Sequence, residues 1–417
     1  MEQVIIVGGG ASGLVAAIVS ARQKNQVTIL EHKDKIGRKI LATGNGKCNY
    51  TNLLQLPECY RSNDSSFAMK VLSCFDVNQT IEFFEQLGIH PKEKHGGIYP
   101  NSEQASSVLD VLRLELDRLK VKICCDVHVE HVHKNKNQFA VRTNKGSYTA
   151  DKVILATGGC ASPNLGSDGS GFGLAKEMGH NIIKPLPALV QLKSDEKYFK
   201  SLAGVRTDAI IKIFVNDKFV SEEKGELLIA NYGVSGIPIF QLSRFASKAL
   251  SEKKKVFLII DYLPSMNELD ALTLITGRIR ANQVKTMEES LIGLLNNKLA
   301  YVCLKEIGIA PTISCAAASN IQIQDLASKI KKWKVRITEP NSFEQAQVSA
   351  GGVDTTEINP ETMESKLVKG LYFTGELIDV DGTCGGYNLQ WAWSTGAVAG
   401  SNKLKCIGEK NDTNYSN

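Results

Sequence analysis

The sequence lacks the features that mark secreted and membrane-spanning chains. Its ten cysteines are scattered over 417 residues without a Cys-x-x-Cys pair, so they do not suggest a disulfide framework. We therefore expect a reduced, cytoplasmic protein. The apolar run from Val4 to Ala21 is broken by four glycines, and no basic residue precedes it as in a signal sequence. No other stretch is long enough to span a bilayer, so we expect no membrane insertion.

A strong excess of one charge is also absent. The formal net charge is +5 and the pI is near 8.5, short of the concentrated positive face of a dedicated nucleic-acid binder. Two basic clusters, 253–255 and 329–336, are interpreted as solvated helix ends or strand edges, although Trp333 in the second could stack on a base. We expect a small-molecule substrate and no nucleic-acid partner. The oligomeric state stays open.

Several catalytic signatures are missing as well. The chain contains neither a P-loop nor a Ser-His-Asp nucleophile elbow. His128, His131 and His133 are of a metal-ligating type, but on an alternating strand only the last two share a face. No carboxylate or cysteine accompanies them at metal-ligand spacing, so no metal site is expected.

The first segment has the pattern strand, glycine turn, helix, strand. The run 4–7 precedes Gly8-x-Gly10-x-x-Gly13, and Glu31 ends the next strand. The first glycine permits the tight turn, the second lets amides approach a pyrophosphate, and the third lets the helix pack closely on the strand. The acid can accept hydrogen bonds from a ribose. This unit predicts a dinucleotide site without separating FAD from NAD.

A loop rich in glycine, asparagine and basic residues follows at 37–49. It can offer amides to phosphate and to ring heteroatoms, a second wall that NAD sites rarely need, so it favours FAD. An ordinary Ω-loop with asparagines in left-handed turns is the alternative. Further on, 152–156 has the pattern of a buried strand returning to the first sheet and ends at Thr157-Gly158-Gly159. A bare turn at the end of that strand is the alternative there.

Two long motifs make the sequence recognisable. GRKILATGNGKCNYTN, after the GGGASG turn, and GELIDVDGTCGGYNLQWAWSTGAVAG near the end closely resemble the BaiN/aminoacetone-oxidase family of bacterial FAD proteins. The resemblance covers essentially the whole chain. It implies an α/β fold: a discontinuous, Rossmann-like FAD-binding domain with three layers in the order β, β, α, as in glutathione reductase, and an inserted β-barrel and helical domain.

The expected domain boundaries follow from this resemblance and from the change of pattern between Pro185 and Arg336. The FAD-binding domain is expected at 1–190 and 336–405, and the inserted substrate domain at 191–335. Within the insert, the barrel would occupy 191–262 and 311–335, and the helical part 263–310. Residues 406–417 would form a flexible tail.

The resemblance also implies which residues hold the cofactor. Lys47 stands where a typical member has arginine, which keeps the charge but loses the bidentate geometry. Tyr387 is the candidate proton donor near the flavin, with simple packing as the alternative. The expected cofactor-binding residues are Gly8, Gly10, Ala11, Ser12, Gly13, Glu31, Arg38, Lys39, Asn45, Gly46, Cys48, Asn49, Thr157, Gly158, Gly159, Gly375, Glu376, Asp379, Gly385, Gly386, Tyr387 and Asn388.

The expected function is that of an FAD-dependent oxidoreductase. The resemblance implies reduction of a C=C bond in a 3-oxo steroid or bile-acid-like substrate by hydride from flavin N5, or else oxidation of an aminoacetone-type amine with release of hydrogen peroxide. An FAD-dependent RNA-modifying enzyme and a non-catalytic flavin-binding protein are the alternatives from other classes. The glycines of 166–171 lack a preceding strand, so NAD(P)H, if it is the transient electron donor, must dock at the flavin. Otherwise oxygen is the second substrate.

Overall fold

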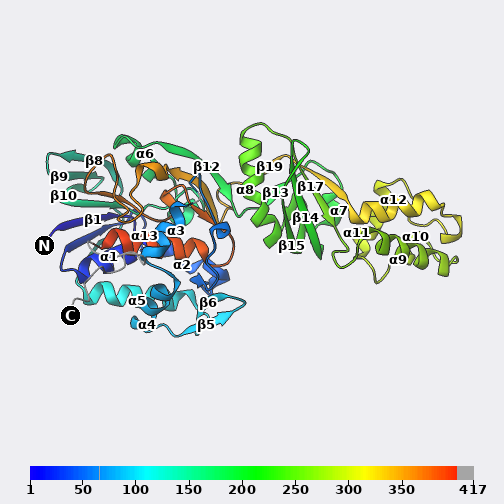
Figure 1. The fold of residues 1–417 in the computed structure, drawn as a ribbon, viewed down its shortest axis with the longest axis horizontal. Helices are drawn as coiled ribbons and strands as arrows, with labels where there is room; N and C mark the ends of the chain where they lie inside the picture. The colour runs from blue at the N-terminus through cyan, green and yellow to red at the C-terminus, as the bar shows by residue number, and fades with distance from the viewer. Residues whose placement is uncertain (65, 402–417) are drawn as a thin grey trace, which may run out of the picture. The chain divides into compact units, whose positions relative to one another are not determined.

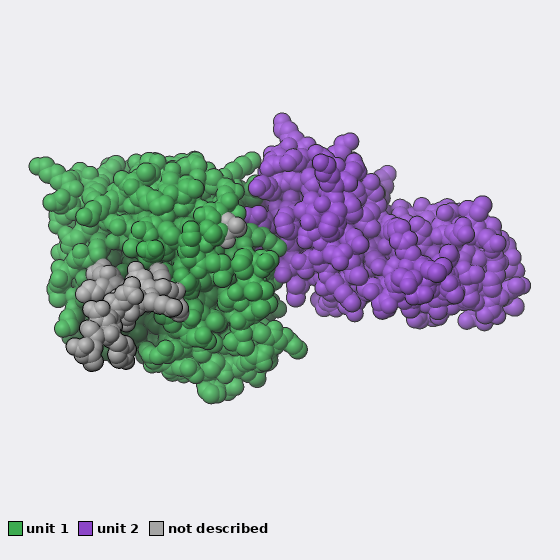
Figure 2. Space-filling view, viewed as in Figure 1, with its two compact units in different colours: residues 1–186, 348–417 green, residues 187–347 purple. Residues whose placement is uncertain are grey.

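The computed structural model describes residues 1–64 and 66–401. They divide into two compact units, shown in different colours in Figure 2. Unit 1 comprises Met1–Leu186 and the chain from Val348 onward, and unit 2 is Pro187–Gln347, against the insert expected at 191–335. The tail expected at 406–417 lies outside the described residues.

A parallel five-stranded sheet forms the centre of unit 1 (Figure 1). Its strand order is β21-β11-β1-β2-β7, and every neighbouring pair is parallel. The four last residues of β1 are buried, as expected for a sheet that is covered on both faces. The return of the chain to this sheet after residue 150 is confirmed, because β11 pairs with β1. The strands are β1 (Gln3–Val7), β2 (Gln26–Leu30), β7 (Lys122–Cys124), β11 (Lys152–Leu155) and β21 (Leu371–Phe373).

Two helices from opposite ends of the chain pack against each other in this unit. They are α1 (Ala11–Arg22) and α13 (Tyr387–Gly400). A Cβ atom on Gly396 would lie 2.4 Å from the carbonyl oxygen of Ser12, so the glycine allows the two backbones to approach closely. A three-stranded antiparallel sheet of β8 (Val129–Asn135), β9 (Gln138–Thr143) and β10 (Gly146–Ala150) adds a further layer. The expected α/β fold of ββα type is therefore confirmed.

Shorter elements complete unit 1. Among the described residues, no helix has both the length and the apolar character to cross a bilayer. The remaining helices and strands are α2 (Arg38–Leu41), β3 (Thr51–Asn52), β4 (Tyr60–Arg61), α3 (Phe67–Cys74), α4 (Val77–Gln86), β5 (Pro91–Lys94), β6 (Gly97–Pro100), α5 (Ala105–Arg118), α6 (Ser170–Glu177), β12 (Ile182–Ala188), β20 (Val348–Val353) and β22 (Asp381–Gly382).

Unit 2 has its own core and a seven-stranded sheet in the order β18-β17-β14-β15-β16-β13-β19. Helix α8 packs on β14 and β15. The strands are β13 (Leu192–Lys193), β14 (Arg206–Val215), β15 (Lys218–Ala230), β16 (Gly233–Ser235), β17 (Val256–Asp261), β18 (Trp333–Ile337) and β19 (Glu339–Pro340). The helices are α7 (Phe199–Leu202), α8 (Ile237–Ser251), α9 (Glu268–Ala281), α10 (Met287–Ser290), α11 (Asn297–Glu306) and α12 (Asn320–Lys331).

Helix α12 lies inside the stretch 311–335 that was expected to belong to a barrel. A capping box explains this difference: the Ser319 side chain accepts a hydrogen bond from the Gln322 amide, and the Gln322 side chain accepts one from the Ser319 amide. Of this stretch, only β18 continues the sheet. Trp333 at its start is fully buried, and its indole donates to the Tyr198 hydroxyl at 3.0 Å, so it is not available to stack on a base.

Candidate functional site

The glycine turn between β1 and α1 leaves open space at one position. Gly8 has φ +106°, and a Cβ there would lie 2.5 Å from the carbonyl oxygen of Ala156. A Cβ on Gly13 would lie 2.1 Å from the carbonyl oxygen of Gly8, whereas one on Gly10 would meet nothing within 4 Å. Helix α1 begins without a side-chain cap, so its first amides are available to an anion.

Glu31 is held at the edge of this turn. The carboxylate is buried, and it accepts hydrogen bonds from the Gly9 amide at 2.7 Å and from the Lys33 amide at 2.8 Å. Each carboxylate oxygen has more than one lone pair, so the group can also accept hydrogen bonds from ribose hydroxyls. The predicted place of Glu31 beside the turn is therefore observed.

The loop 37–49 folds back through left-handed residues, with Asn45 at φ 52° and Gly46 at φ 82°. A Cβ on Gly46 would meet nothing within 4 Å. The Oδ1 atom of Asn49 is buried and has no hydrogen-bond partner among the described residues. Cys48 is fully buried, which raises the pKa of its thiol to about 11, so it is a packed thiol rather than a nucleophile.

Lys39 joins this loop to the carboxyl-terminal motif. Its ammonium donates to Glu376 Oε2 at 2.8 Å and to the carbonyl oxygen of Ala161 at 3.0 Å. Glu376 Oε1 also accepts from the Ser349 amide at 2.8 Å. Ser349 was not anticipated from the sequence, since no motif marks it, yet its hydroxyl accepts from the amides of Cys160 and Ala161 at 2.8 and 3.1 Å.

The Thr157-Gly158-Gly159 step lies next to the same cluster. Gly158 has φ +73°, and a Cβ on Gly159 would lie 2.6 Å from Ser349 Oγ and 2.7 Å from Glu376 Oε1. The hydroxyl oxygen of Thr157 is buried without a partner in the described part of the chain. The step is therefore a tight approach, and Thr157 has a polar atom that a ligand could satisfy.

The carboxyl-terminal motif, which begins at Gly375, contacts β3, the strand that follows the loop 37–49. Gly385 and Gly386 have φ +123° and +99°, and a Cβ on Gly386 would lie 2.8 Å from the backbone of Thr51 and 3.0 Å from Asn49 Oδ1. Asn388 accepts from the Gly382 amide at 2.8 Å and donates to the Gly382 carbonyl at 2.9 Å. Asn388 therefore shapes the turn through its side chain.

Tyr387 and Asp379 are both buried near this turn. Tyr387 is 6% exposed, and its ring meets that of Tyr60 edge to face, with 5.8 Å between the centroids. Burial is the largest cause that raises the pKa of the Tyr387 phenol well above its usual value, and the neighbouring Cys59 adds to it. Asp379 is 2% exposed and accepts a hydrogen bond from the Asn63 amide at 3.3 Å.

A buried polar network behind the motif was missed by the sequence analysis. The amide of Gln390 accepts from the Thr51 hydroxyl at 2.5 Å and donates to the hydroxyls of Thr80 and Ser394, each at 2.8 Å. The indole of Trp391 donates to the carbonyl oxygen of Gly375 at 3.0 Å. These contacts hold α13 against β3 and α4, and the sequence signal for them was weak, since Gln390 is one of several polar residues in this helix.

Two basic residues of the loop 37–49 form ion pairs with acidic side chains. Arg38 forms an ion pair with Asp34 at 3.1 Å. Lys47 pairs with Glu103 at 3.3 Å, and hydrogen bonds from Lys92, Lys94 and Lys47 lower the pKa of that carboxyl to about 2. Neither contact places these side chains against the open space at Gly10.

The arrangement fits FAD on three observations. Asn49 and Thr157 each have a buried polar atom without a partner among the described residues, Gly10 and Gly46 border open space, and α1 begins with uncapped amides. A dinucleotide would supply the missing hydrogen-bond partners and the anion. All of these residues belong to unit 1.

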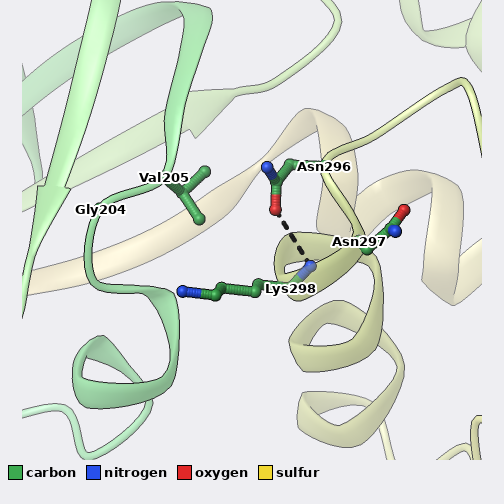
Figure 3. A pocket seen from close by; sticks show the side chains of 5 residues that line it. All are labelled: Gly204, Val205, Asn296, Asn297 and Lys298. Carbon is green, nitrogen blue, oxygen red and sulfur yellow. Dashed lines mark hydrogen bonds between the residues drawn. The ribbon is translucent and has the colours of Figure 1, made fainter.

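A separate pocket lies in unit 2, and none of the expected cofactor-binding residues lines it (Figure 3). It has a volume of about 410 Å³ and lies at the start of α11. Asn296 caps this helix by accepting from the Lys298 amide at 3.0 Å, and the Lys298 ammonium donates to the Ala203 carbonyl at 3.2 Å. Its lining residues are Gly204, Val205, Asn296, Asn297 and Lys298.

The fold and the glycine turn define a Rossmann-type nucleotide-binding protein. The chain belongs to the HI0933-like Rossmann domain family, whose profile matches residues 2–402, so the family resemblance of the sequence is confirmed. A 3-dehydro-bile acid delta(4,6)-reductase of Clostridium scindens is 46% identical over 96% of this chain and 98% of that protein. With this family and this relative, the protein is an FAD-dependent oxidoreductase.

More distant similarities exist. A ribosomal RNA dihydrouridine synthase of Haemophilus influenzae is 32% identical over 94% of this chain and 96% of that protein. The open conformation of a flavocytochrome c3 fumarate reductase aligns with 96% of this chain and 77% of its own, with a TM-score of 0.47 and 15% identity.

Proposed function

We propose that this protein reduces a C=C bond conjugated to a carbonyl group in a 3-oxo steroid or bile-acid-like substrate. The observation that carries the proposal is the 46% identity, over nearly the full length of both chains, to a 3-dehydro-bile acid reductase. In such a reaction a hydride adds to one carbon of the double bond and a proton to the other. The electron donor we propose is NAD(P)H, docking transiently at the flavin.

Different residues of the site would bind different parts of FAD. Gly10 and the first amides of α1 would receive the pyrophosphate, and Glu31 the adenosine ribose. Asn49 and Thr157 would turn their unpaired polar atoms to the cofactor. Asp379 would face the ribityl chain, and the start of α13 the flavin ring. FAD, when bound, supplies the hydride at N5.

Tyr387 is the proposed proton donor. The raised pKa of its phenol keeps the group protonated at neutral pH, so it has a proton to give. Its ring lies at the first residue of α13, directly after the glycine pair. Tyr60, which packs against it, donates its own hydroxyl to Gln55 at 2.6 Å and is thus already engaged.

A second candidate substrate is a uracil base in ribosomal RNA. The relative from Haemophilus influenzae that is named for dihydrouridine formation covers 94% of this chain and favours it. Dihydrouridine is uridine with its ring C=C bond reduced, and that bond is conjugated to a carbonyl group. Both candidate substrates would therefore undergo the same reaction, reduction of a C=C bond conjugated to a carbonyl group, in a steroid or in an RNA base.

Anaerobic stopped-flow measurements test the proposal. FAD-loaded protein is reduced with NADH and then mixed with a 3-oxo-4-ene steroid, with the saturated 3-oxo steroid as matched control, with oxygen, or with an unmodified rRNA fragment. We expect rapid reoxidation by the unsaturated steroid and none by the saturated one. Fast reoxidation by oxygen together with no product from either C=C acceptor would refute a reductase. Reoxidation by the RNA alone would assign the second candidate.

A further inference from the structure

Three lysines of unit 1 surround a single carboxylate. The ammonium groups of Lys92, Lys94 and Lys47 lie 2.6, 2.5 and 3.3 Å from the carboxylate oxygens of Glu103. Lys47 belongs to the loop 37–49, Lys92 and Lys94 belong to β5, and Glu103 lies between β6 and α5. We call these four residues the lysine cluster.

The lysine cluster has an excess of positive charge. Hydrogen bonds from the lysines lower the pKa of Glu103 to about 2, so this carboxyl is ionised at neutral pH, and three positive charges face one negative charge. The lysine side chains are 39–51% exposed, and each ammonium group can donate three hydrogen bonds, so donors remain for a further anion. The other acid of β5, Glu93, accepts from the Gly96 amide at 2.6 Å.

The lysine cluster lies beside residues expected to hold the flavin end of FAD. Strand β5 forms a hairpin with β6, which pairs with β3 (Figure 1). A Cβ on Gly97 of β6 would lie 2.8 Å from the amide nitrogen of Asn49, and one on Gly386 would lie 3.0 Å from Asn49 Oδ1. The Asn49 side chain is thus enclosed between the hairpin that carries two of the lysines and the start of α13. Lys47 is two residues from Asn49.

Apolar side chains are attached to the same hairpin. Leu53 and Leu54 are 52% and 54% exposed. The Leu53 amide donates to the carbonyl oxygen of Gly96 at 2.8 Å, and the Leu54 amide donates to Asn52 Oδ1 at 3.0 Å. Asn52 in turn donates to the carbonyl oxygen of Gly385 at 3.0 Å. The two leucines therefore lie on a loop that joins the end of the hairpin to the glycine pair before α13.

A phosphomonoester is the anion that fits this charge. At neutral pH it carries a charge of about −1.5 to −2 and three oxygens that accept hydrogen bonds, whereas a carboxylate carries one charge and two oxygens. Lysine binds phosphate as a point charge, so Lys47 can contribute without the bidentate geometry of arginine. NADPH differs from NADH by one such group, the 2′-phosphate of its adenosine ribose.

We propose that the lysine cluster binds the 2′-phosphate of NADPH and thereby makes NADPH, rather than NADH, the preferred electron donor. Leu53 and Leu54 would pack against the adenine ring. The inference rests on the proposed function in one respect, that a nicotinamide docks at the flavin. In that step the nicotinamide loses a hydride, which is two electrons and one proton, to flavin N5 and leaves as NADP⁺. NADH would react in the same way with a higher KM.

Binding of 2′,5′-ADP and 5′-AMP to the FAD-loaded protein tests the site without electron transfer, because these nucleotides differ only in the 2′-phosphate. Isothermal titration calorimetry gives both Kd values. We expect 2′,5′-ADP to bind at least about tenfold more tightly than 5′-AMP. Lys92→Ala and Lys94→Ala should each weaken binding of 2′,5′-ADP by about fivefold. Lys332→Ala, at an exposed lysine paired with Glu268, is the matched control and should leave it unchanged.

Kinetics on the same variants supply a second readout. The KM for NADPH should rise in Lys92→Ala and Lys94→Ala by about the same factor as the Kd for 2′,5′-ADP, whereas the KM for NADH and both kcat values should stay as in the unchanged protein. Thermal unfolding and the FAD absorbance show whether each variant keeps its fold and its cofactor.

Two outcomes would overturn the proposal: equal affinities of the unchanged protein for 2′,5′-ADP and 5′-AMP, or equal effects of Lys94→Ala and Lys332→Ala. A rise in the KM of a carboxylated steroid, with 2′,5′-ADP binding unchanged, would assign the lysines to the substrate instead. Protein whose flavin is reduced by light, without nicotinamide, is also mixed with the unsaturated steroid. A failure of the reductase is thereby distinguished from a failure of the phosphate site.

Discussion

Lys39 and Glu376 lie 337 positions apart in the sequence, yet their Nζ and Oε2 atoms are 2.8 Å apart. The pair ties the loop after β2 to the turn after β21. Because Glu376 also accepts from the Ser349 amide, one carboxylate connects three separate segments of unit 1. Both side chains are partly buried, so their interaction is less screened by water than that of a surface pair.

Lys39→Met should therefore destabilise the protein more than the loss of a surface ion pair does. We expect the free energy of unfolding to fall by about 1–3 kcal/mol, because a partly buried carboxylate oxygen loses its charged donor. Urea denaturation measures this. Arg142→Ala removes an exposed pair with Glu130 and should cost less than about 1 kcal/mol. Equal losses in the two variants would show that the Lys39 pair has no special role.

Gly10→Ala separates folding from cofactor binding. The added Cβ meets no protein atom within 4 Å, and the backbone of Gly10, at φ −83°, is allowed for alanine. The thermal midpoint of the FAD-free protein should not change, whereas the Kd for FAD should rise at least about tenfold, since the methyl group would occupy the place of the pyrophosphate. FAD titration by fluorescence gives the Kd. Gly173→Ala, also in open space, is the control and should bind FAD normally.

Thr157→Val should have opposite effects on the two states of the protein. It removes a buried hydroxyl without a described partner, so we expect the FAD-free protein to gain about 1 kcal/mol in urea denaturation. The Kd for FAD should rise about tenfold, through loss of one hydrogen bond. Thr355→Val removes another such hydroxyl and should stabilise both states equally. Unchanged FAD affinity in Thr157→Val would remove this residue from the cofactor site.

Tyr387→Phe tests the proposed proton donor. Turnover should fall about 100-fold or more while FAD stays bound, and Tyr60→Phe should have a much smaller effect. Because burial raises the pKa of the Tyr387 phenol above about 10, this group should cause no loss of turnover as the pH rises toward that value. A loss of turnover with an apparent pKa well below 10 in the unchanged protein, absent in Tyr387→Phe, would contradict that shift.

The elements of the nucleotide fold were predictable because their signals are local. Val4–Val7 is an unbroken apolar run, and the motif Gly8-x-Gly10-x-x-Gly13 follows it directly. The pairing of Lys39 with Glu376 was not predictable, since no local pattern specifies a partner across more than 300 residues. The same holds for Ser349 and Gln390, whose roles depend on which backbone groups the fold brings to them.

In unit 2 the features that the sequence did not reveal depend on strand register and on helix capping. The alternation of β14 and β15 does not reveal that Phe219 faces Phe214, because a shift in register between Ile213 and Phe214 decides it. Helix α12 could have been found from Ser319 and Gln322, which form a capping box before a periodic apolar run.

Strands β12 and β20 pair with each other, and the chain leaves unit 1 along the first and re-enters it along the second. The backbone at Gly351 comes so near to Lys184 that a Cβ would lie 2.5 Å from its carbonyl oxygen. Because the two ends of the insertion are neighbours, the entropic cost of closing the inserted segment grows only slowly with its length. The 161 residues of unit 2 can therefore be exchanged for another domain at a small entropic cost to the FAD-binding fold.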